Sequence, residues 1–245
     1  MSCFILLYLL LLPHWQANDV ATSNTSLQTN SFMQDTITVE IWSDVMCPFC
    51  YIGKRRFEAA LAQFPERDQV KIIWRSFQLD PDLKTEPGKS VAQSLSEKKG
   101  WSAAQTAQMI DHVTGMARSA GLEYHFDKAV VANSFDAHRF AHYAKTKGYQ
   151  DAAEERLFAA YFTEGKNTAD HATLAQIGSE IGLDSAAVRE VLASDEFAGE
   201  VTEDIELARQ FGITGVPFFV FNRKYAVSGA QDVQVFLQTL RRSAE

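Results

Sequence analysis

The fold is decided by residues 37–51, ITVEIWSDVMCPFCY, in which Cys47 and Cys50 are separated by two residues. At the start of this stretch Val39 and Ile41 alternate with polar neighbours, and the run is rich in β-branched residues. Alternation of this kind predicts a half-buried β-strand. The cysteine pair therefore comes directly after a strand.

A helix is predicted to begin at the cysteine pair. Asp44 is a turn-forming residue, so it separates the strand from the helix. Pro48 suits the first turn of a helix, because its missing N–H needs no partner there. Phe57, Leu61 and Phe64 then recur at helical spacing. The sequence places both cysteines at the N-terminus of this helix.

The remaining pattern predicts an α/β fold. Residues 70–79 have strand character, and a strand–helix–strand order implies a parallel pair with a right-handed crossover. Strand character returns at residues 218–221 and 225–228, and a helical pattern comes after them. Between these parts the apolar residues recur at helical spacing. We expect one α/β domain, residues 37–89 and 212–245, interrupted by an all-helical insertion, residues 90–211.

Cysteines at this position favour thiol–disulfide exchange. The thiolate is the nucleophile in that reaction, and unpaired N–H groups and the helix dipole stabilise a thiolate at a helix N-terminus. Cys47 stands at that position, while Cys50 lies one turn further in and closer to the core. The spacing predicts an exposed attacking thiol at Cys47 and a protected resolving thiol at Cys50.

A zinc site is the main alternative interpretation of the pair. A structural zinc needs four ligands, and the sequence has no second Cys-x-x-Cys. His138 and His142 are four residues apart, but they lie far along the chain, so a core or surface position is favoured for both. We expect no metal and no cofactor besides the cysteine pair. The remaining cysteine, Cys3, is expected to have no role.

Residues 1–36 are excluded from the predicted fold. The apolar run Phe4–Leu12 is too short to span a bilayer, which takes about 20 residues, so no stable membrane span is expected. It fits the core of a signal peptide, but residues 1–36 contain no Lys or Arg. We expect a disordered leader or a start assigned too early, with Met33 just before the first strand. The protein is then cytoplasmic, or periplasmic if the segment is an export signal.

Composition excludes few other classes. The formal net charge is −8, and no basic block stands out, so nucleic-acid binding is not expected. Hydrophobic residues make up 46% and charged residues 22%, which is ordinary for a globular protein.

A second motif, Thr214-Gly215-Val216-Pro217, stands just before the strand at residues 218–221. Proline in a sheet is confined to edges, strand starts or bulges, and a cis bond before proline is typical of tight turns. Together with VEIWSDVMCPFCY (residues 39–51), GITGVPFFVFNRKYAVSGAQ (residues 212–231) resembles the DsbA family. NSFDAHRFAHYAK (residues 133–145) and YFTEGKNTADHATLAQIGSEIGLD (residues 161–184) resemble its FrnE-like branch.

The resemblance implies a thioredoxin-like fold in which the helical insertion is a lid over the active site. It implies that Cys47 is the nucleophile and Cys50 the resolver. It further implies a cis bond between Val216 and Pro217, beside the sulfurs. Val216 would then offer its backbone to an extended substrate strand. The alternative for Pro217 is an ordinary proline at a strand start.

The two residues between the cysteines are candidate substrate contacts and set the redox direction. Strongly oxidising DsbA-type proteins have a histidine here, whereas this chain has Pro48 and Phe49. A phenyl ring cannot hydrogen-bond the Cys47 thiolate, so the disulfide should be less oxidising. The oxidase, reductase and isomerase directions stay open. Trp42 and Phe219 are candidates for a peptide groove or, in preference, for the core; Asp44 is a candidate proton relay or, in preference, a turn residue.

We expect protein or peptide thiols and disulfides as substrates, and glutathione is a candidate electron partner. The alternative function is a glutathione-dependent transferase or isomerase of the kappa-class or hydroxychromene carboxylate isomerase type. Those enzymes carry serine at the position of Cys47 and lack the second thiol, so Cys50 discriminates against them. A second alternative is a non-catalytic metal-binding or partner-binding module, which the intact pair argues against.

Overall fold

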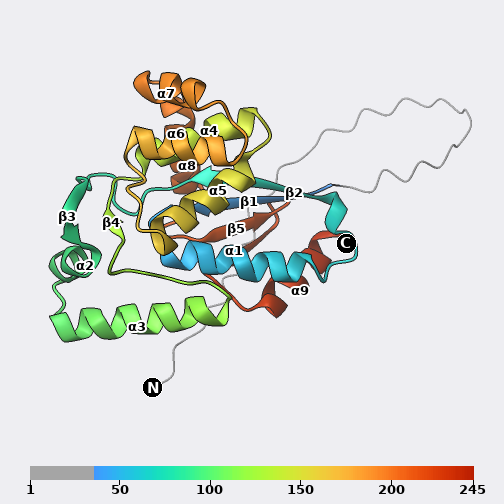
Figure 1. The fold of residues 1–245 in the computed structure, drawn as a ribbon. Helices are drawn as coiled ribbons and strands as arrows, with labels where there is room; N and C mark the ends of the chain where they lie inside the picture. Colours follow the sequence, from blue (N-terminus) through green and yellow to red (C-terminus); the bar gives the residue numbers. More distant parts are fainter. Residues whose placement is uncertain (1–35) are drawn as a thin grey trace, which may run out of the picture.

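The computed structural model of the chain describes residues 36–245 (Figure 1). The predictions for the N-terminal segment, a disordered leader or a misplaced start, concern residues 1–36, of which residues 1–35 lie outside the described part. Within that part, no helix has the length and apolar character needed to cross a membrane.

A four-stranded sheet with the order β2-β1-β5-β6 forms the centre of the α/β domain. Its strands are β1 (Ile37–Ser43), β2 (Val70–Ser76), β5 (Phe218–Phe221) and β6 (Tyr225–Ser228). β1 pairs with β2 in parallel and with β5 antiparallel, and β5 and β6 form a hairpin. The strand that leads to the cysteines is therefore central in the sheet, between one early strand and one late strand.

Two helices cover one face of the sheet. They are α1 (Pro48–Leu61) and α9 (Val233–Ser243), which pack against each other. Phe57 on α1 and Phe236 on α9 meet the β5 side chain of Phe219, with ring centroids 5.6 Å and 4.7 Å from it. This aromatic cluster holds the cysteine-bearing helix on the strands.

The opposite face of the sheet is covered by α8 (Ala198–Gln210). Neighbouring side chains on a strand point to opposite faces of the sheet, so Trp42 lies on the face opposite to Ile41. Trp42 is fully buried there and donates its indole N–H to the Asp204 carbonyl at 2.9 Å. Although α8 falls in the range 90–211 predicted as the insertion, it packs as a layer of the α/β domain.

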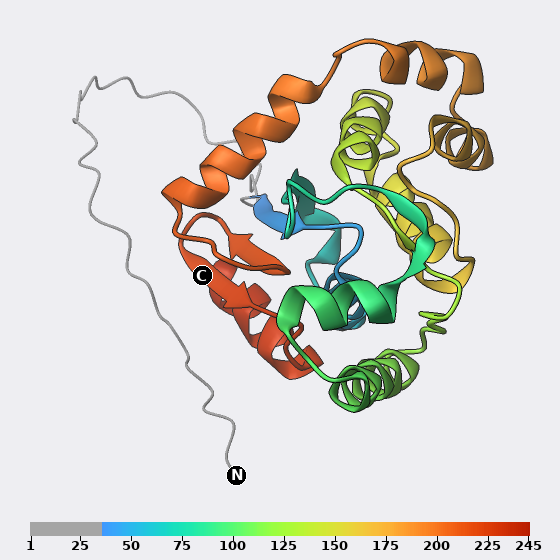
Figure 2. The same ribbon diagram turned by 90° about the vertical axis from the view of Figure 1, so that its left-hand side faces the viewer.

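The insertion curves around one side of the sheet, from α3 (green) to α7 (orange) in Figure 2. A short strand, β4 (Val130–Val131), also lies here, whereas the sequence predicted only helices; it pairs with β3 (Glu86–Ser90), most of which comes just before the predicted insertion, to form a two-stranded ribbon. The β-branched pair Val130-Val131 supplies one strand of this ribbon. The remaining elements are the 3₁₀ turn Arg67–Gln69, β3 (Glu86–Ser90), α2 (Val91–Lys99), α3 (Ala103–Ser119), β4 (Val130–Val131), α4 (Phe135–Thr146), α5 (Gln150–Phe158), the π-helical segment Ala159–Thr163, α6 (His171–Glu180) and α7 (Ser185–Ala193).

The second strand ends at Ser76, before the predicted residue 79, because the Leu79 N–H beyond it is taken by a side chain. The Ser76 N–H donates to the Asp204 carboxylate at 2.9 Å, and the Leu79 N–H donates to the Asp44 carboxylate at 2.7 Å. The chain leaves the sheet at Ser76, and the second of these bonds ties the departing loop to the turn before the cysteines.

Candidate active site

Both cysteines lie at the N-terminus of α1, as the sequence predicts. Cys47 is the N-cap residue in an extended conformation, and Pro48 occupies the first helical turn. The Cys50 N–H donates to the Cys47 carbonyl at 3.0 Å, which closes the turn between them. The first turn contains no acidic side chain, so the positive end of the helix dipole is left to act on the Cys47 sulfur.

The expectation that the attacking thiol is exposed was wrong. Cys47 is 2% exposed and Cys50 is 1% exposed, and both are free thiols. Both belong to a hydrophobic cluster that runs from α1 into the insertion. Periodicity along a single helix could not reveal this cover, because it comes from residues that are distant along the chain.

The environment of Cys50 keeps this thiol protonated. Burial raises the pKa of Cys50 well above its usual value, and hydrogen bonding to and repulsion by the Cys47 sulfur raise it further. The Ser43 hydroxyl and the Asp44 backbone N–H oppose that rise in pKa. The raised pKa of Cys50 leaves Cys47, at the helix N-cap, as the candidate attacking thiol.

The Val216–Pro217 segment lies against the attacking sulfur. The Cys47 thiol donates to the Val216 carbonyl at 3.5 Å, and the Val216–Pro217 bond is cis. A Cβ atom placed on Gly53 of α1 would lie 3.0 Å from the Pro217 ring. The loop after β1, the helix and the late strand thus meet at one point, although they are far apart in the sequence.

Of the two residues between the cysteines, Pro48 is tied to the insertion. The Tyr124 hydroxyl donates to the Pro48 carbonyl at 2.7 Å. Phe49 is half-buried and packs at the margin of the cluster that contains the cysteines. Their assignment as substrate contacts stays a prediction.

An aromatic stack that the sequence did not predict covers the helix N-terminus. Tyr51 stacks on Phe158 with centroids 5.0 Å apart, and Tyr124 stacks on Phe162 with centroids 4.5 Å apart. Burial raises the pKa of Tyr124, and repulsion by thiolates at the cysteine pair adds to the rise. The helical spacing of Phe158 and Phe162 was visible in the sequence, but nothing there indicated that α1 is the surface they face.

The remaining residues that the sequence singled out lie in different parts of the structure. Trp42 and Phe219 are fully buried in the core and do not line a groove. His142 lies 3.1 Å from both the Ser76 hydroxyl and the Asp204 carboxylate, whereas His138 lies 3.6 Å from Asp44. The two histidines therefore face different partners. No group of three or more His, Cys, Asp or Glu residues within 36–245 has the arrangement of a metal site.

Asp44 is more than a turn residue. Its carboxylate accepts the Leu79 N–H at 2.7 Å and lies within 3.6 Å of the buried His138 ring, which comes from α4. Its carbonyl accepts the Cys47 N–H at 2.9 Å. One residue therefore connects the cysteine turn, the loop after β2 and the insertion.

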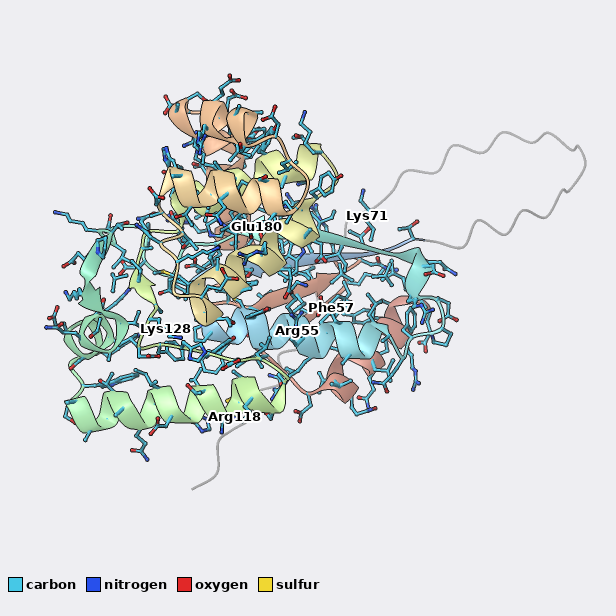
Figure 3. All side chains as sticks on the ribbon, viewed as in Figure 1. Arg55, Phe57, Lys71, Arg118, Lys128 and Glu180 are labelled. Carbon is cyan, nitrogen blue, oxygen red and sulfur yellow. The ribbon has the colours of Figure 1, made fainter. Side chains whose placement is uncertain are left out.

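A second polar network joins α1 to α5, and Figure 3 labels one of its members, Arg55. Arg55, labelled on α1, donates to Glu155 at 2.8 Å, and the Tyr51 hydroxyl donates to the same carboxylate at 2.7 Å. The ammonium of Lys54, whose side chain is buried, lies 3.0 Å from Glu155. The insertion is thereby fastened to the cysteine-bearing helix by charge as well as by aromatic packing.

Comparison with known proteins gives a consistent result. The family model described as a DSBA-like thioredoxin domain matches residues 38–241. A crystal structure of a probable DsbA oxidoreductase from Streptomyces coelicolor is 40% identical, with a TM-score of 0.80 over 84% of this chain and 89% of that one. An uncharacterised protein of Bacillus subtilis, YwbO, is 28% identical over 82% of this chain and 94% of its own length.

A more distant structure shares the fold. The cytosolic disulfide reductase DsbM from Pseudomonas aeruginosa, solved with GSH, is 20% identical. It aligns over 84% of this chain and 99% of its own, with a TM-score of 0.57.

Proposed function

The chain belongs to the family of DsbA-like thioredoxin domains, and from this premise we propose that it exchanges disulfides with protein or peptide substrates through Cys47 and Cys50. The observation that carries the proposal is the asymmetry of the pair. Cys47 stands at the helix N-cap against the Val216 carbonyl, while Cys50 is sealed behind it with a raised pKa. An attacking and a resolving thiol need this difference.

The exchange proceeds in two displacements. The Cys47 thiolate attacks one sulfur of a substrate disulfide, forms a mixed disulfide and releases the other substrate sulfur as a thiolate. Cys50 then loses its proton and attacks the Cys47 sulfur, so that the Cys47–Cys50 bond forms and the second substrate thiolate leaves. The substrate gains two electrons and the pair loses two, and the reverse sequence oxidises a dithiol.

Val216 is placed to hold the substrate backbone. Its carbonyl accepts the Cys47 thiol in the reduced protein. When Cys47 is joined to a substrate it has no proton to donate, and the carbonyl becomes available to an N–H of an extended peptide. Pro217, whose ring lies close to Gly53 on α1, fixes this backbone beside the sulfur.

We further propose that the pair works as a reductant or isomerase with glutathione as its electron partner. Phe49 cannot stabilise the Cys47 thiolate by a hydrogen bond, which favours a less oxidising disulfide. The Pseudomonas aeruginosa protein of similar fold is described as a cytosolic disulfide reductase and was solved with GSH, which supports glutathione as the first electron donor to test. Membership of the FrnE-like branch and a cytoplasmic location stay predictions.

The rival function, a glutathione-dependent transferase or isomerase, needs no second thiol. Cys50 is present, buried and bonded through its N–H to the Cys47 carbonyl, which supports exchange over transfer. An active Cys50→Ala protein in a glutathione-transfer assay would favour the rival.

The test of exchange is to trap the first intermediate. In a Cys3→Ser background, which removes the cysteine outside the pair, Cys50→Ala should accumulate mixed disulfides with oxidised peptides through Cys47. Cys47→Ala is the matched control and should accumulate none, because its remaining thiol is buried and its pKa is raised. Trapping by Cys47→Ala alone would reverse the two roles, and trapping by neither variant would contradict the proposed function.

A further inference from the structure

A short connection between α3 and β4 passes the start of α1, and neither displacement of the exchange uses it. This strap, residues 122–129, has no helix or strand of its own. Leu122, Tyr124 and Ala129 are buried and belong to the hydrophobic cluster that contains both cysteines. Glu123, between the first two, is exposed. The strap therefore has one side toward the cysteine pair and the other toward solvent.

One polar contact fastens the strap to the cysteine turn. The Tyr124 hydroxyl donates to the Pro48 carbonyl at 2.7 Å, and among residues 36–245 this is the one hydrogen bond between the strap and residues 47–50. A carbonyl has two lone pairs, and the hydrogen-bond ladder of a helix uses one of them. The first turn of α1 therefore keeps its own bond if the tyrosine hydroxyl leaves Pro48.

The Tyr124 hydroxyl stays a donor throughout the reaction. Burial raises the pKa of Tyr124, and negative charge at Cys47 raises it further. The hydroxyl consequently keeps its proton when Cys47 is a thiolate.

Two further hydrogen bonds connect the strap to the π-helical segment that follows α5. The His125 N–H donates to the Phe162 carbonyl at 2.7 Å, and the Thr163 hydroxyl donates to the Glu123 carbonyl at 2.7 Å. The strap thus has two bonds to this segment and one to the cysteine turn.

Packing also joins the strap to the π-helical segment. The Tyr124 ring stacks on Phe162 with centroids 4.5 Å apart, whereas the centroid of Tyr51 on α1 is 6.2 Å away. A Cβ atom placed on Gly165, just after the segment, would lie 2.6 Å from the carbonyl oxygen of Lys128, a residue labelled in Figure 3. Because the strap is held more closely by the π-helical segment than by α1, the contact that can open is the one at the cysteine turn.

Tyr124 and Val216 approach the cysteine pair from different sides of β1. Val216 leads into β5, which lies next to β1 on one side, and β2 lies on the other. The Trp74 indole N–H on β2 donates to Asp151 of α5 at 2.9 Å, so α5 and the π-helical segment after it lie on the β2 side. Figure 2 shows the late strands (red) on one side of β1 (blue) and this segment (yellow) on the other. An extended substrate at Cys47 would therefore have one edge toward Val216 and the other toward Tyr124.

An extended peptide carries backbone N–H and C=O groups along both edges. When one edge pairs with Val216, the carbonyls of the other edge need a donor, and the Tyr124 hydroxyl is a donor held at the cysteine turn. We propose that Tyr124 is a specificity-determining residue of the exchange: a carbonyl beside the substrate cysteine takes the hydroxyl from Pro48, and the strap opens for peptide disulfides in preference to disulfides without a carbonyl.

The inference rests on the proposed exchange, and two reagents with the same leaving group separate them. In a Cys3→Ser, Cys50→Ala protein, attack by Cys47 releases coloured thiopyridone from dithiodipyridine, which has no carbonyl. It releases the same product from a capped peptide whose cysteine carries the same pyridylthio group. Tyr124→Phe keeps the ring and loses the donor. Its rate with the peptide should fall by about fivefold to tenfold, as expected for one lost hydrogen bond, while its rate with dithiodipyridine should stay equal or rise.

The ratio of the two rates is a readout that a merely structural role would not move, because damage to the site would slow both reagents alike. Tyr143→Phe removes a hydroxyl from another buried tyrosine of the insertion and is the matched control, with an unchanged ratio. An unchanged ratio in Tyr124→Phe would overturn the role of Tyr124 and leave the exchange intact. Release from neither reagent by the protein that retains Tyr124 would overturn both.

A crystal structure of the mixed disulfide between Cys47 and the peptide provides a second measurement. The Tyr124 hydroxyl should lie within hydrogen-bond distance of a peptide carbonyl and no longer of the Pro48 carbonyl. A hydroxyl that is still bonded to Pro48 in this complex would contradict the proposal.

Discussion

At the scale of single residues, the closest approach in the active site involves a glycine. Gly53 lies on α1 where a Cβ atom would be 3.0 Å from the Pro217 ring and 3.4 Å from the ring of Phe219. Only a residue without a side chain lets the helix approach this closely. The distance from Cys47 to the Val216 carbonyl depends on that approach.

Gly53→Ala should therefore impair the site. An alanine would gain helix propensity of about 1 kcal/mol, but the overpacking against Pro217 should cost about 1–3 kcal/mol. We expect a small net loss of stability and a several-fold slower attack by Cys47, measured by thermal unfolding and by the release of thiopyridone from dithiodipyridine in the Cys3→Ser, Cys50→Ala background.

Gly115 provides the matched control, since it is exposed on α3 and a Cβ there would meet no atom within 4 Å. Gly115→Ala should raise stability by up to about 1 kcal/mol and leave the rate of attack unchanged. Equal rates of attack in the two variants would contradict the role given to the close approach.

At the scale of elements, the attachment of α5 to α1 depends on the charge of Glu155. Burial alone would raise the pKa of Glu155, but hydrogen bonds from Arg55 and Tyr51 and the charge of Lys54 lower it to about 2 from an ordinary 4.5. Because the pKa is lower in the folded chain, the stabilisation is present above pH 4.5 and is lost as the pH falls toward 2.

Glu155→Gln should lower the free energy of unfolding at pH 7 by about 1–2 kcal/mol, a value reduced from the full shift because the carboxylate is partly exposed. The difference from wild type should shrink steadily as the pH falls from 4.5 toward 2, where both proteins approach the same stability. Urea unfolding across this pH range measures the difference in the free energy of unfolding between the two proteins. Glu190→Gln, at an exposed position on α7, is the control; a difference that stays constant with pH would show that Glu155 acts by shape alone.

The elements of the α/β domain could be predicted from the sequence because they are local patterns. β1, β5 and β6 lie at the predicted residues, and the helix begins at the cysteine pair. The end of the second strand could not be predicted, since the Leu79 N–H bonds a carboxylate that is distant in the sequence. The placement of α8 on the sheet could not be predicted either, because it depends on tertiary packing.

The active site divides in the same way. Residue type and spacing were enough to predict the roles of Cys47, Cys50 and the motif ending at Pro217. They were not enough for His138, because a lone histidine on a helix is ordinary until its burial is known. The sequence favoured a core or surface position for His138 over a role as metal ligand, and the side chain is buried.

At the scale of the whole molecule, the burial of Cys47 means that a substrate must displace part of the cover. Local opening is then part of the reaction, as it is for any buried group that exchanges with solvent. In a Cys3→Ser, Cys50→Ala protein, Cys47 should react at least tenfold faster with iodoacetamide than with a polymer-linked iodoacetamide. Low urea concentrations should bring the rates of the small and the large reagent closer together. In the unfolded protein the two reagents should react with Cys47 at similar rates.

Mass spectrometry of quenched samples measures both rates. If the large and small reagents react equally fast with the native protein, the cover over Cys47 does not restrict access. If urea leaves the ratio unchanged up to the unfolding midpoint, access does not depend on opening of the insertion.

The position of β1 between β2 and β5 also has a consequence for synthesis on the ribosome. β2 comes soon after the cysteine turn, but β5 and the Val216 carbonyl come only after the whole insertion. Because chains emerge from the N-terminal end, Cys47 and Cys50 wait, without their late neighbours, until residues 216–221 have been translated. During that interval the two thiols are those of an unfinished chain, open to oxidation or to partners that the completed protein would exclude.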